Sequence, residues 1–108
     1  SGKSKWTEYE WSALYHLSYL QLENEHLATA KKLILSLKTK TETIYPKSDY
    51  KQVAATLLLA RWYMAEANIP DTERLIAEAT LFLDNMKDHH SWYRAQLFLL
   101  RAELYMLK

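Results

Sequence analysis

The chain has 108 residues, which fits one domain. Apolar residues make up 49% of it, enough to build a core and too many for a disordered tail. With 14 basic and 13 acidic residues the formal net charge is +1, so the basic surplus that is typical of a nucleic-acid-binding module is missing. The chain has no cysteine, which excludes disulfides, thiolate catalysis and cysteine-ligated zinc.

Turn-forming residues are few. The sequence holds one Gly and two Pro, whereas a β-rich domain of this size needs many more residues of this kind for its turns. No apolar run approaches the ~18 residues of a membrane-spanning helix, and no signal peptide is visible. We therefore expect an all-α, cytoplasmic protein of long helices and short connections that has no membrane partner.

The first two helices are expected over 7–23 and 26–44. Thr7 and Glu10 have the spacing of a capping box, which places a helix start at Thr7, and Pro46 ends the second helix. The first helix carries two apolar stripes at helical spacing, one assigned to the core (Ala13, Leu14, Leu17, Leu20) and one distinct from it (Trp11, Tyr15, Tyr19, Leu22). The core face of the second is expected to be Leu27, Ala30, Leu33, Ile34 and Leu37.

Three more helices are expected over 49–66, 70–86 and 91–106. Ser48 or Asp49 can cap the third helix, which is apolar on most sides and should therefore be the central, most buried one. Pro70 is tolerated in the first turn of the fourth helix. Ser91 is expected to cap the fifth helix, after a polar loop.

The helix pairs repeat with a period of 42 residues. Both breaks inside the pairs and all three starts of the odd-numbered helices share this register. Ser18, Ala60 and Ala102 become equivalent, and we expect each of these small residues to lie where helices approach closely. One such hairpin cannot bury its apolar face alone, so stacked hairpins are required. The prediction is one domain over 3–108, an antiparallel helix-hairpin solenoid of about five helices and two and a half repeats, which we expect to be a fragment of a longer protein.

These repeats resemble the tetratricopeptide family. Leu59-Ala60-x-x-Tyr63 followed by Ile76-x-x-Ala79 is similar to the family pattern of a large residue before a small one, then an aromatic, then a small residue in the next helix. The period differs from the usual 34, and Glu25 and Ala67 stand where the family has Gly. Repeats of about this longer size occur in kinesin light chains and in bacterial transcriptional activators of the maltose-regulator type.

The resemblance implies a concave surface lined by the odd-numbered helices. Residues that are 42 apart should fall in rows across it, one row made of Tyr19, Arg61 and Glu103 and a second made of Tyr15, Leu57 and Leu99. Trp11 begins the aromatic stripe that recurs every four residues and is typical of interaction hot spots. The partner-binding site is therefore expected to be Trp11, Tyr15, Tyr19, Leu57, Arg61, Leu99 and Glu103. Packing of the stripe on another part of a full-length protein is the alternative.

The sequence contains no pattern that predicts a catalytic or metal centre. The chain has no nucleophile elbow and no Gly-rich phosphate loop, so we expect no enzyme activity, no catalytic residues and no cofactor. Asp88-His89-His90 is a weak metal candidate, because adjacent histidines in a loop rarely face one ion.

Binding of a protein or peptide partner on the concave face, as a scaffold or interaction module, is therefore the function that the sequence favours. The alternative is a ligand-sensing or oligomerisation domain of a bacterial transcriptional regulator, and a homo-oligomer stays possible.

Overall fold

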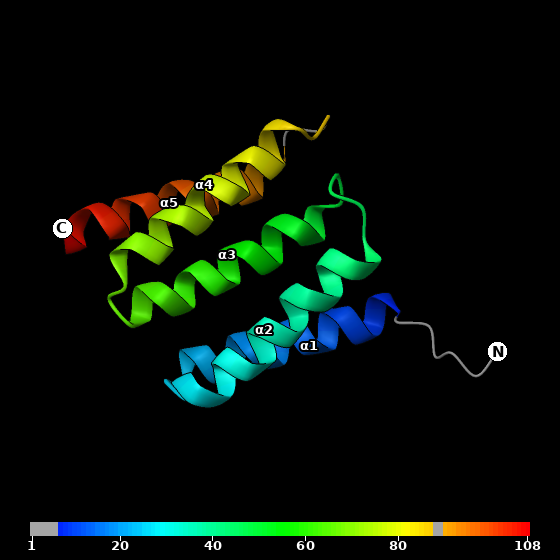
Figure 1. Ribbon diagram of the computed structural model, residues 1–108, viewed down its shortest axis with the longest axis horizontal. Helices are drawn as coiled ribbons and strands as arrows, with labels where there is room; N and C mark the ends of the chain where they lie inside the picture. Colours follow the sequence, from blue (N-terminus) through cyan, green and yellow to red (C-terminus); the bar gives the residue numbers. More distant parts are fainter. Residues whose placement is uncertain (1–6, 88–89) are drawn as a thin grey trace.

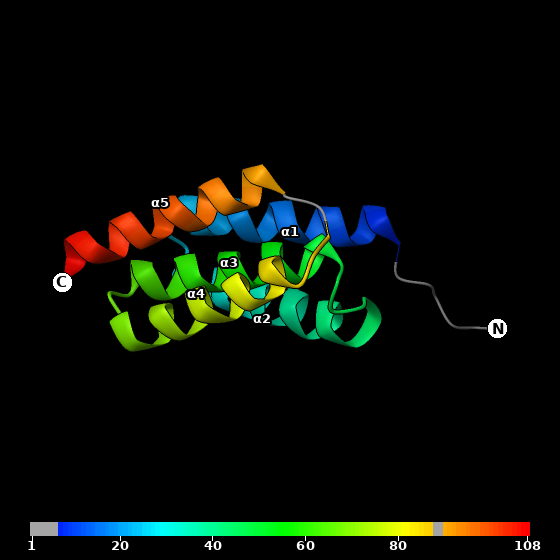
Figure 2. The same cartoon turned by 90° about the horizontal axis from the view of Figure 1, so that it is seen from above.

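The computed structural model describes residues 7–87 and 90–108. Its helices are α1 (Glu8–Glu23), α2 (Leu27–Ile44), α3 (Tyr50–Ala65), α4 (Ile69–Asp84) and α5 (Ser91–Leu107). Successive helices run antiparallel, with the α1–α2 pair on one side of α3 and the α4–α5 pair on the other (Figure 1). Seen from above, α1 and α5 lie on one side of the molecule and α2 and α4 on the other, with α3 between them (Figure 2). The all-α helical repeat expected from the sequence is confirmed.

The repeat is visible in hydrogen bonds between helices. Gln52 at the start of α3 donates from Nε2 to the carbonyl oxygen of Thr41 in α2, at 3.1 Å. Arg94 at the start of α5 donates from Nη2 to the carbonyl oxygen of Leu83 in α4, also at 3.1 Å. Both donors and both acceptors are 42 residues apart, although the side chains differ. The 42-residue period therefore applies to the arrangement of the helices, even where the residue types differ.

The two turns inside the helix pairs are also equivalent. Glu25 and Ala67 adopt left-handed backbone angles, with φ of 61° and 57°. In the first turn the N–H of Glu25 bonds to the Leu22 oxygen and the N–H of His26 to the Gln21 oxygen. The turn at Ala67 repeats both bonds 42 residues later. This is the Schellman arrangement, which closes a helix and usually has Gly at the left-handed position.

The core is centred on α3. Ten consecutive residues, 51–60, are buried, as expected for the central helix. On α2, Ala30, Ile34 and Leu37 are fully buried, which confirms most of the expected core face. The Thr7–Glu10 capping box is present at the start of α1, and Asp49 caps α3 through the N–H of Lys51.

Three expectations about α1 and α5 are wrong. The stripe of α1 assigned to the core is mostly outside it, because Leu17 and Leu20 are 45% and 54% exposed and Ala13 is exposed too. The described helices cover α1 only with α2 and α3, so its remaining side faces solvent. His90, and not Ser91, holds the N-cap position of α5, without a side-chain capping bond. Ala102 is exposed, whereas its equivalents in α1 and α3, Ser18 and Ala60, are fully buried.

The left-handed turn residues give a stability prediction. A residue with a Cβ is strained in this conformation and Gly is not. We expect Glu25→Gly and Ala67→Gly each to raise the free energy of unfolding by about 0.5–1 kcal/mol. Ala77→Gly is the matched control, because Ala77 is exposed in the middle of α4 and Gly there should destabilise by about 1 kcal/mol. Urea unfolding that shows a loss in all three variants would contradict the assigned turns.

A second matched pair tests the packing at the small residues. Ala60 is fully buried in α3, so Ala60→Leu should overpack this contact and cost about 1–3 kcal/mol. Ala102 is its equivalent in the repeat and is exposed, so Ala102→Leu should stay within about 0.5 kcal/mol of the wild type. Thermal melts of the two variants check this difference, and equal losses would show that Ala102 is packed as tightly as Ala60, against the burial seen in the structure.

Candidate partner-binding groove

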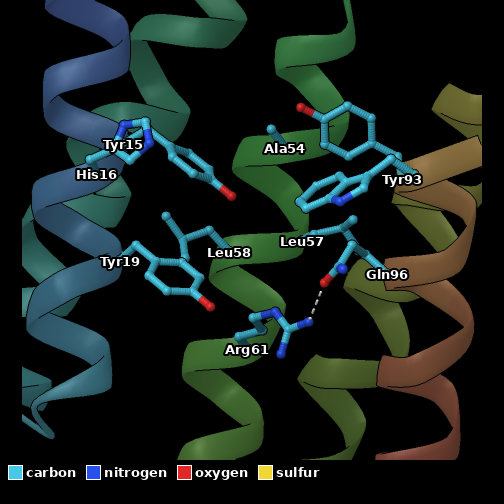
Figure 3. A pocket seen from close by; sticks show the side chains of 10 residues that line it. Tyr15, His16, Tyr19, Ala54, Leu57, Leu58, Arg61, Tyr93 and Gln96 are labelled. Atoms are coloured by element: carbon cyan, nitrogen blue, oxygen red, sulfur yellow. Dashed lines mark hydrogen bonds between the residues drawn. The ribbon is translucent and has the colours of Figure 1, made fainter. Parts of the chain in front are cut away.

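A groove runs between α1 and α5, with α3 as its floor (Figure 3). The main hollow has a volume of about 270 Å³. The residues that line this hollow are Tyr15, His16 and Tyr19 of α1, Ala54, Leu57, Leu58 and Arg61 of α3, and Trp92, Tyr93 and Gln96 of α5. A second hollow of about 230 Å³ shares Arg61 and is also lined by Met64 and Glu103. Arg61 lines both hollows, so they lie next to each other, and we call the two together the groove.

The α1 wall of the groove is aromatic. The rings of Tyr15 and Tyr19 lie one helical turn apart with their centroids at 6.4 Å, and both hydroxyl groups point into the hollow (Figure 3). Burial raises the pKa of Tyr15, the neighbouring Tyr19 adds to the effect, and Arg61 opposes it. Tyr15 is half-buried whereas Tyr19 is 39% exposed. Tyr15 is thus the fixed part of the wall and Tyr19 the part most accessible to a partner.

Arg61 crosses the floor of the groove towards α5. Its Nη2 donates to Oε1 of Gln96 at 2.8 Å (Figure 3), and its Nη1 lies 3.8 Å from a carboxylate oxygen of Glu103. Arg61 and Glu103, which the repeat places in one row, therefore form an ion pair between α3 and α5. A partly exposed ion pair of this kind contributes only about 0–1 kcal/mol to stability. The polar strip can therefore rearrange around a partner at low cost.

The α5 wall contains two aromatic residues that the sequence analysis missed. Trp92 and Tyr93 contact each other edge to face, with ring centroids 5.0 Å apart, and Tyr93 also stacks on Tyr50 of α3 at 5.9 Å. Burial raises the pKa of Tyr93 to about 12, with further contributions from Tyr15, Tyr50 and Asp49. The repeat gives no signal for this wall, because the equivalents 42 residues earlier, Tyr50 and Lys51, do not line the groove.

A buried lysine fixes one end of the groove. Lys51 is 2% exposed, and its Nζ lies 2.7 Å from Glu8 and 3.5 Å from Asp49. The same ammonium group lies over the rings of Tyr45 and Tyr50, at 4.5 and 4.6 Å from their centroids. Burial lowers the pKa of Lys51, but the hydrogen bond to Glu8 and the negative charge of Asp49 outweigh it, so the net shift is upward. This cluster ties the start of α1 to the start of α3.

The expected site residues divide into three groups. Tyr15, Tyr19, Leu57 and Arg61 line the first hollow, and Arg61 and Glu103 line the second. Leu57 is a floor residue of which only 5% is exposed.

Trp11 is the main correction. It is 5% exposed and its indole N–H donates to Oγ1 of Thr41 at 2.9 Å, so it belongs to the core. A stripe with a spacing of four residues drifts around a helix, because four residues exceed one turn of 3.6. Trp11 at one end therefore faces α2, whereas Tyr19 faces the groove.

Leu99 is the third case. It is 53% exposed, but it lines neither hollow of the groove. Of the apolar row that the sequence predicted, Tyr15 and Leu57 line the groove, whereas Leu99 of α5 does not.

No cluster of three or more metal-ligating side chains occurs among residues 7–87 and 90–108. Two members of the weak Asp88-His89-His90 candidate lie outside the described residues. Within the same ranges no helix is long and apolar enough to cross a membrane.

The raised pKa values predict loss of stability at high pH. A tyrosine in the unfolded chain titrates near pH 10, whereas Tyr93 in the fold titrates near 12. The folded state holds this proton more tightly, so its contribution is fully present below pH 10 and is lost as the pH rises through 12. The pKa of Lys51 is also raised in the fold, so its contribution to stability is lost at high pH as well. We expect the free energy of unfolding to fall between pH 10 and 12, and to fall less steeply in Tyr93→Phe. Equal slopes in urea titrations would contradict this assignment.

In comparisons with known proteins, no family model, no curated protein and no solved structure matches the chain.

Proposed function

We propose that this chain is a protein-interaction module that binds a peptide segment of another protein in the groove between α1 and α5. The observation that carries the proposal is the groove's composition. Tyr15 and Tyr19 form one wall, Trp92 and Tyr93 the other, and Arg61 crosses the floor. Aromatic and arginine side chains are the types that contribute most to binding at protein interfaces.

The size of the groove favours a peptide over a small molecule. Pockets for small ligands usually enclose about 300–1,000 Å³ and bury most of the ligand. The two hollows here measure about 270 and 230 Å³, and both open along the groove. Each therefore suits one or two side chains of a longer segment. This argues against a small-molecule site in the groove, although the hollow of about 500 Å³ between α2 and α4 is large enough for a small ligand.

The chemistry of the lining describes the segment that would fit. Ala54, Leu57 and Leu58 offer an apolar floor, over which an aliphatic or aromatic side chain loses its contact with water. The hydroxyl groups of Tyr15 and Tyr19 and the guanidinium of Arg61 edge this floor (Figure 3). They can bond to the carbonyl or carboxylate groups of a bound segment. We therefore propose a peptide with one apolar anchor followed by an acceptor-rich stretch.

The test uses peptides selected from a random library on the wild-type chain. Tyr15→Ala combined with Tyr19→Ala should weaken the selected peptides by about 2 kcal/mol or more, roughly 30-fold in Kd. Isothermal titration calorimetry measures the affinity. Leu81→Ala is the control, because Leu81 is 64% exposed and lines a different surface, between α2 and α4. This control should bind like the wild type.

Stability must be followed in the same variants, because Tyr15 also stacks on Trp11, with ring centroids 5.2 Å apart. Tyr19→Ala alone serves as the milder variant, since Tyr19 is more exposed. Peptides that bind all the variants equally would exclude the groove as the partner site. Loss of folding in Tyr19→Ala would make the tyrosine stripe a structural element and would also end the proposal.

A further inference from the structure

Helix α5 has one side that no described helix covers. Its inner side is buried at Leu97, Leu100 and Leu104. Its neighbouring sides reach Arg61 through Gln96 and Thr80 of α4 through Arg101. The remaining side is apolar and exposed. We call it the outer face of α5, and it consists of Ala95, Phe98, Ala102, Tyr105 and Met106, with Phe98, Tyr105 and Met106 exposed by 71%, 80% and 85%.

The equivalent side of α3 is covered. Trp62 of α3 donates to the Leu27 oxygen of α2, and Arg61 reaches α5. The helical period of 3.6 residues places Val53, Thr56 and Ala60 on the side of α3 that points away from both α2 and α5. This side faces α4, the helix with which α3 packs most extensively. These three residues are fully buried. They are the 42-residue equivalents of Ala95, Phe98 and Ala102 in the outer face.

Helix α1 follows the same rule. Leu14 and Ser18 are the next equivalents in the series, and Ser18 is fully buried where α1 packs on α2. In both helix pairs this side is therefore covered by the antiparallel helix that comes next in the chain. Among the described residues, α5 is the one odd-numbered helix whose equivalent side has no helix packed over it.

The covering helices share one stripe. Four positions 42 residues apart are buried in both: Ala30 and Thr72, Ile34 and Ile76, Leu37 and Ala79, Thr41 and Leu83. Their spacing of four, three and four residues keeps them on one face of a helix. The stripe begins with a small residue and has isoleucine next.

We propose that the outer face of α5 is the docking site for an amphipathic α-helix that lies antiparallel to α5 and carries a stripe like that of α2 and α4. The site lies on a different side of α5 from the peptide groove and does not rest on the function proposed for that groove. Two observations specify the occupant: α2 and α4 share buried residues at four equivalent positions, and the equivalent face of α1 and α3 is covered.

A second copy of this chain is a poorer occupant. An antiparallel pair of α5 helices facing each other about a two-fold axis would place the same flank of both helices together. The α4 flank carries Arg94 and Arg101, which bond to Leu83 and Thr80 of α4. Four arginines would then line one edge. Each Arg94 is paired with Asp84 at 3.5 Å, whereas no described carboxylate pairs with Arg101, so the two Arg101 charges are the ones that oppose association. A helix of different sequence has no such restriction.

The test supplies the helix within the same chain. Lys108 is the repeat equivalent of Glu66, so a copy of residues 67–84 appended after Lys108 continues the register. The matched control is the same extension with the copies of Ile76 and Leu83 changed to Asp. The wild-type chain has no cysteine, so a single introduced thiol reports exposure cleanly. Ala102→Cys places it in the outer face, where the equivalent Ser18 shows that a side chain of this size is tolerated under a covering helix. Ala77→Cys, exposed on α4, is the reference.

We expect the extension to slow thiol modification at Ala102→Cys by at least about tenfold, because the thiol can then react only when the added helix opens locally. Ala77→Cys should react at an unchanged rate. The melting temperature should rise by about 5 °C or more over the Asp-containing control. Equal rates and melting temperatures in the two extended chains would overturn the proposal. A chain without any extension that sediments as a dimer, and already protects Ala102→Cys but not Ala77→Cys, would overturn it in favour of a second copy.

Discussion

The burial of α3 on every side is the constraint on which the other helices depend. Ten consecutive residues, 51–60, are buried, and a helix without an exposed face needs neighbours all round it. Three of the ten are polar and have to be satisfied inside the core. Lys51 bonds to Glu8, Gln52 to the end of α2, and Thr56 to the carbonyl oxygen of Gln52 one turn earlier. Because an unpaired buried polar group costs about 1–3 kcal/mol, these bonds restrict where α1 and α2 can lie.

The groove follows from this arrangement. α1 and α5 both pack on α3, and in the view of Figure 1 they lie on opposite sides of it. The side of α3 between them lines the bottom of the groove. That floor is small at Ala54 and long at Arg61, which leaves a hollow at one end and a polar crossing at the other. The aromatic walls are held by contacts outside the groove, with Tyr15 stacked on buried Trp11 and Tyr93 on Tyr50. Both walls are thus supported by contacts outside the groove, which makes its shape preorganised.

The repeat conserves positions more strictly than residue types. A glutamine at 52 and an arginine at 94 make the same bond to the preceding helix. A glutamate at 25 and an alanine at 67 occupy the same left-handed turn. Backbone geometry and the need to satisfy carbonyl groups are common to both units, whereas the side chain that meets the need is free to change. A comparison of residue identities alone therefore understates the regularity of the molecule.

The sequence by itself determined the local structure. The Thr7–Glu10 capping box, the Asp49 cap, the breaks at Glu25 and Ala67 and the apolar character of α3 are properties of short segments, and the helix bounds follow from them. The period of 42 also predicts one row for Tyr19, Arg61 and Glu103, which line the two adjacent hollows that share Arg61. These inferences succeed because helical spacing and turn chemistry act over a few residues.

Only the tertiary structure decided which apolar faces are covered. In α1 the sequence offers two stripes of similar hydrophobicity, and the choice between them depends on where α2 and α3 lie. Trp11 therefore became a core residue bonded to Thr41, while Leu17 and Leu20 stayed exposed. Ala102 looks like Ala60 in the sequence, yet only Ala60 has a helix packed over it. Burial is a property of the neighbours that a residue meets, and those neighbours are distant along the chain.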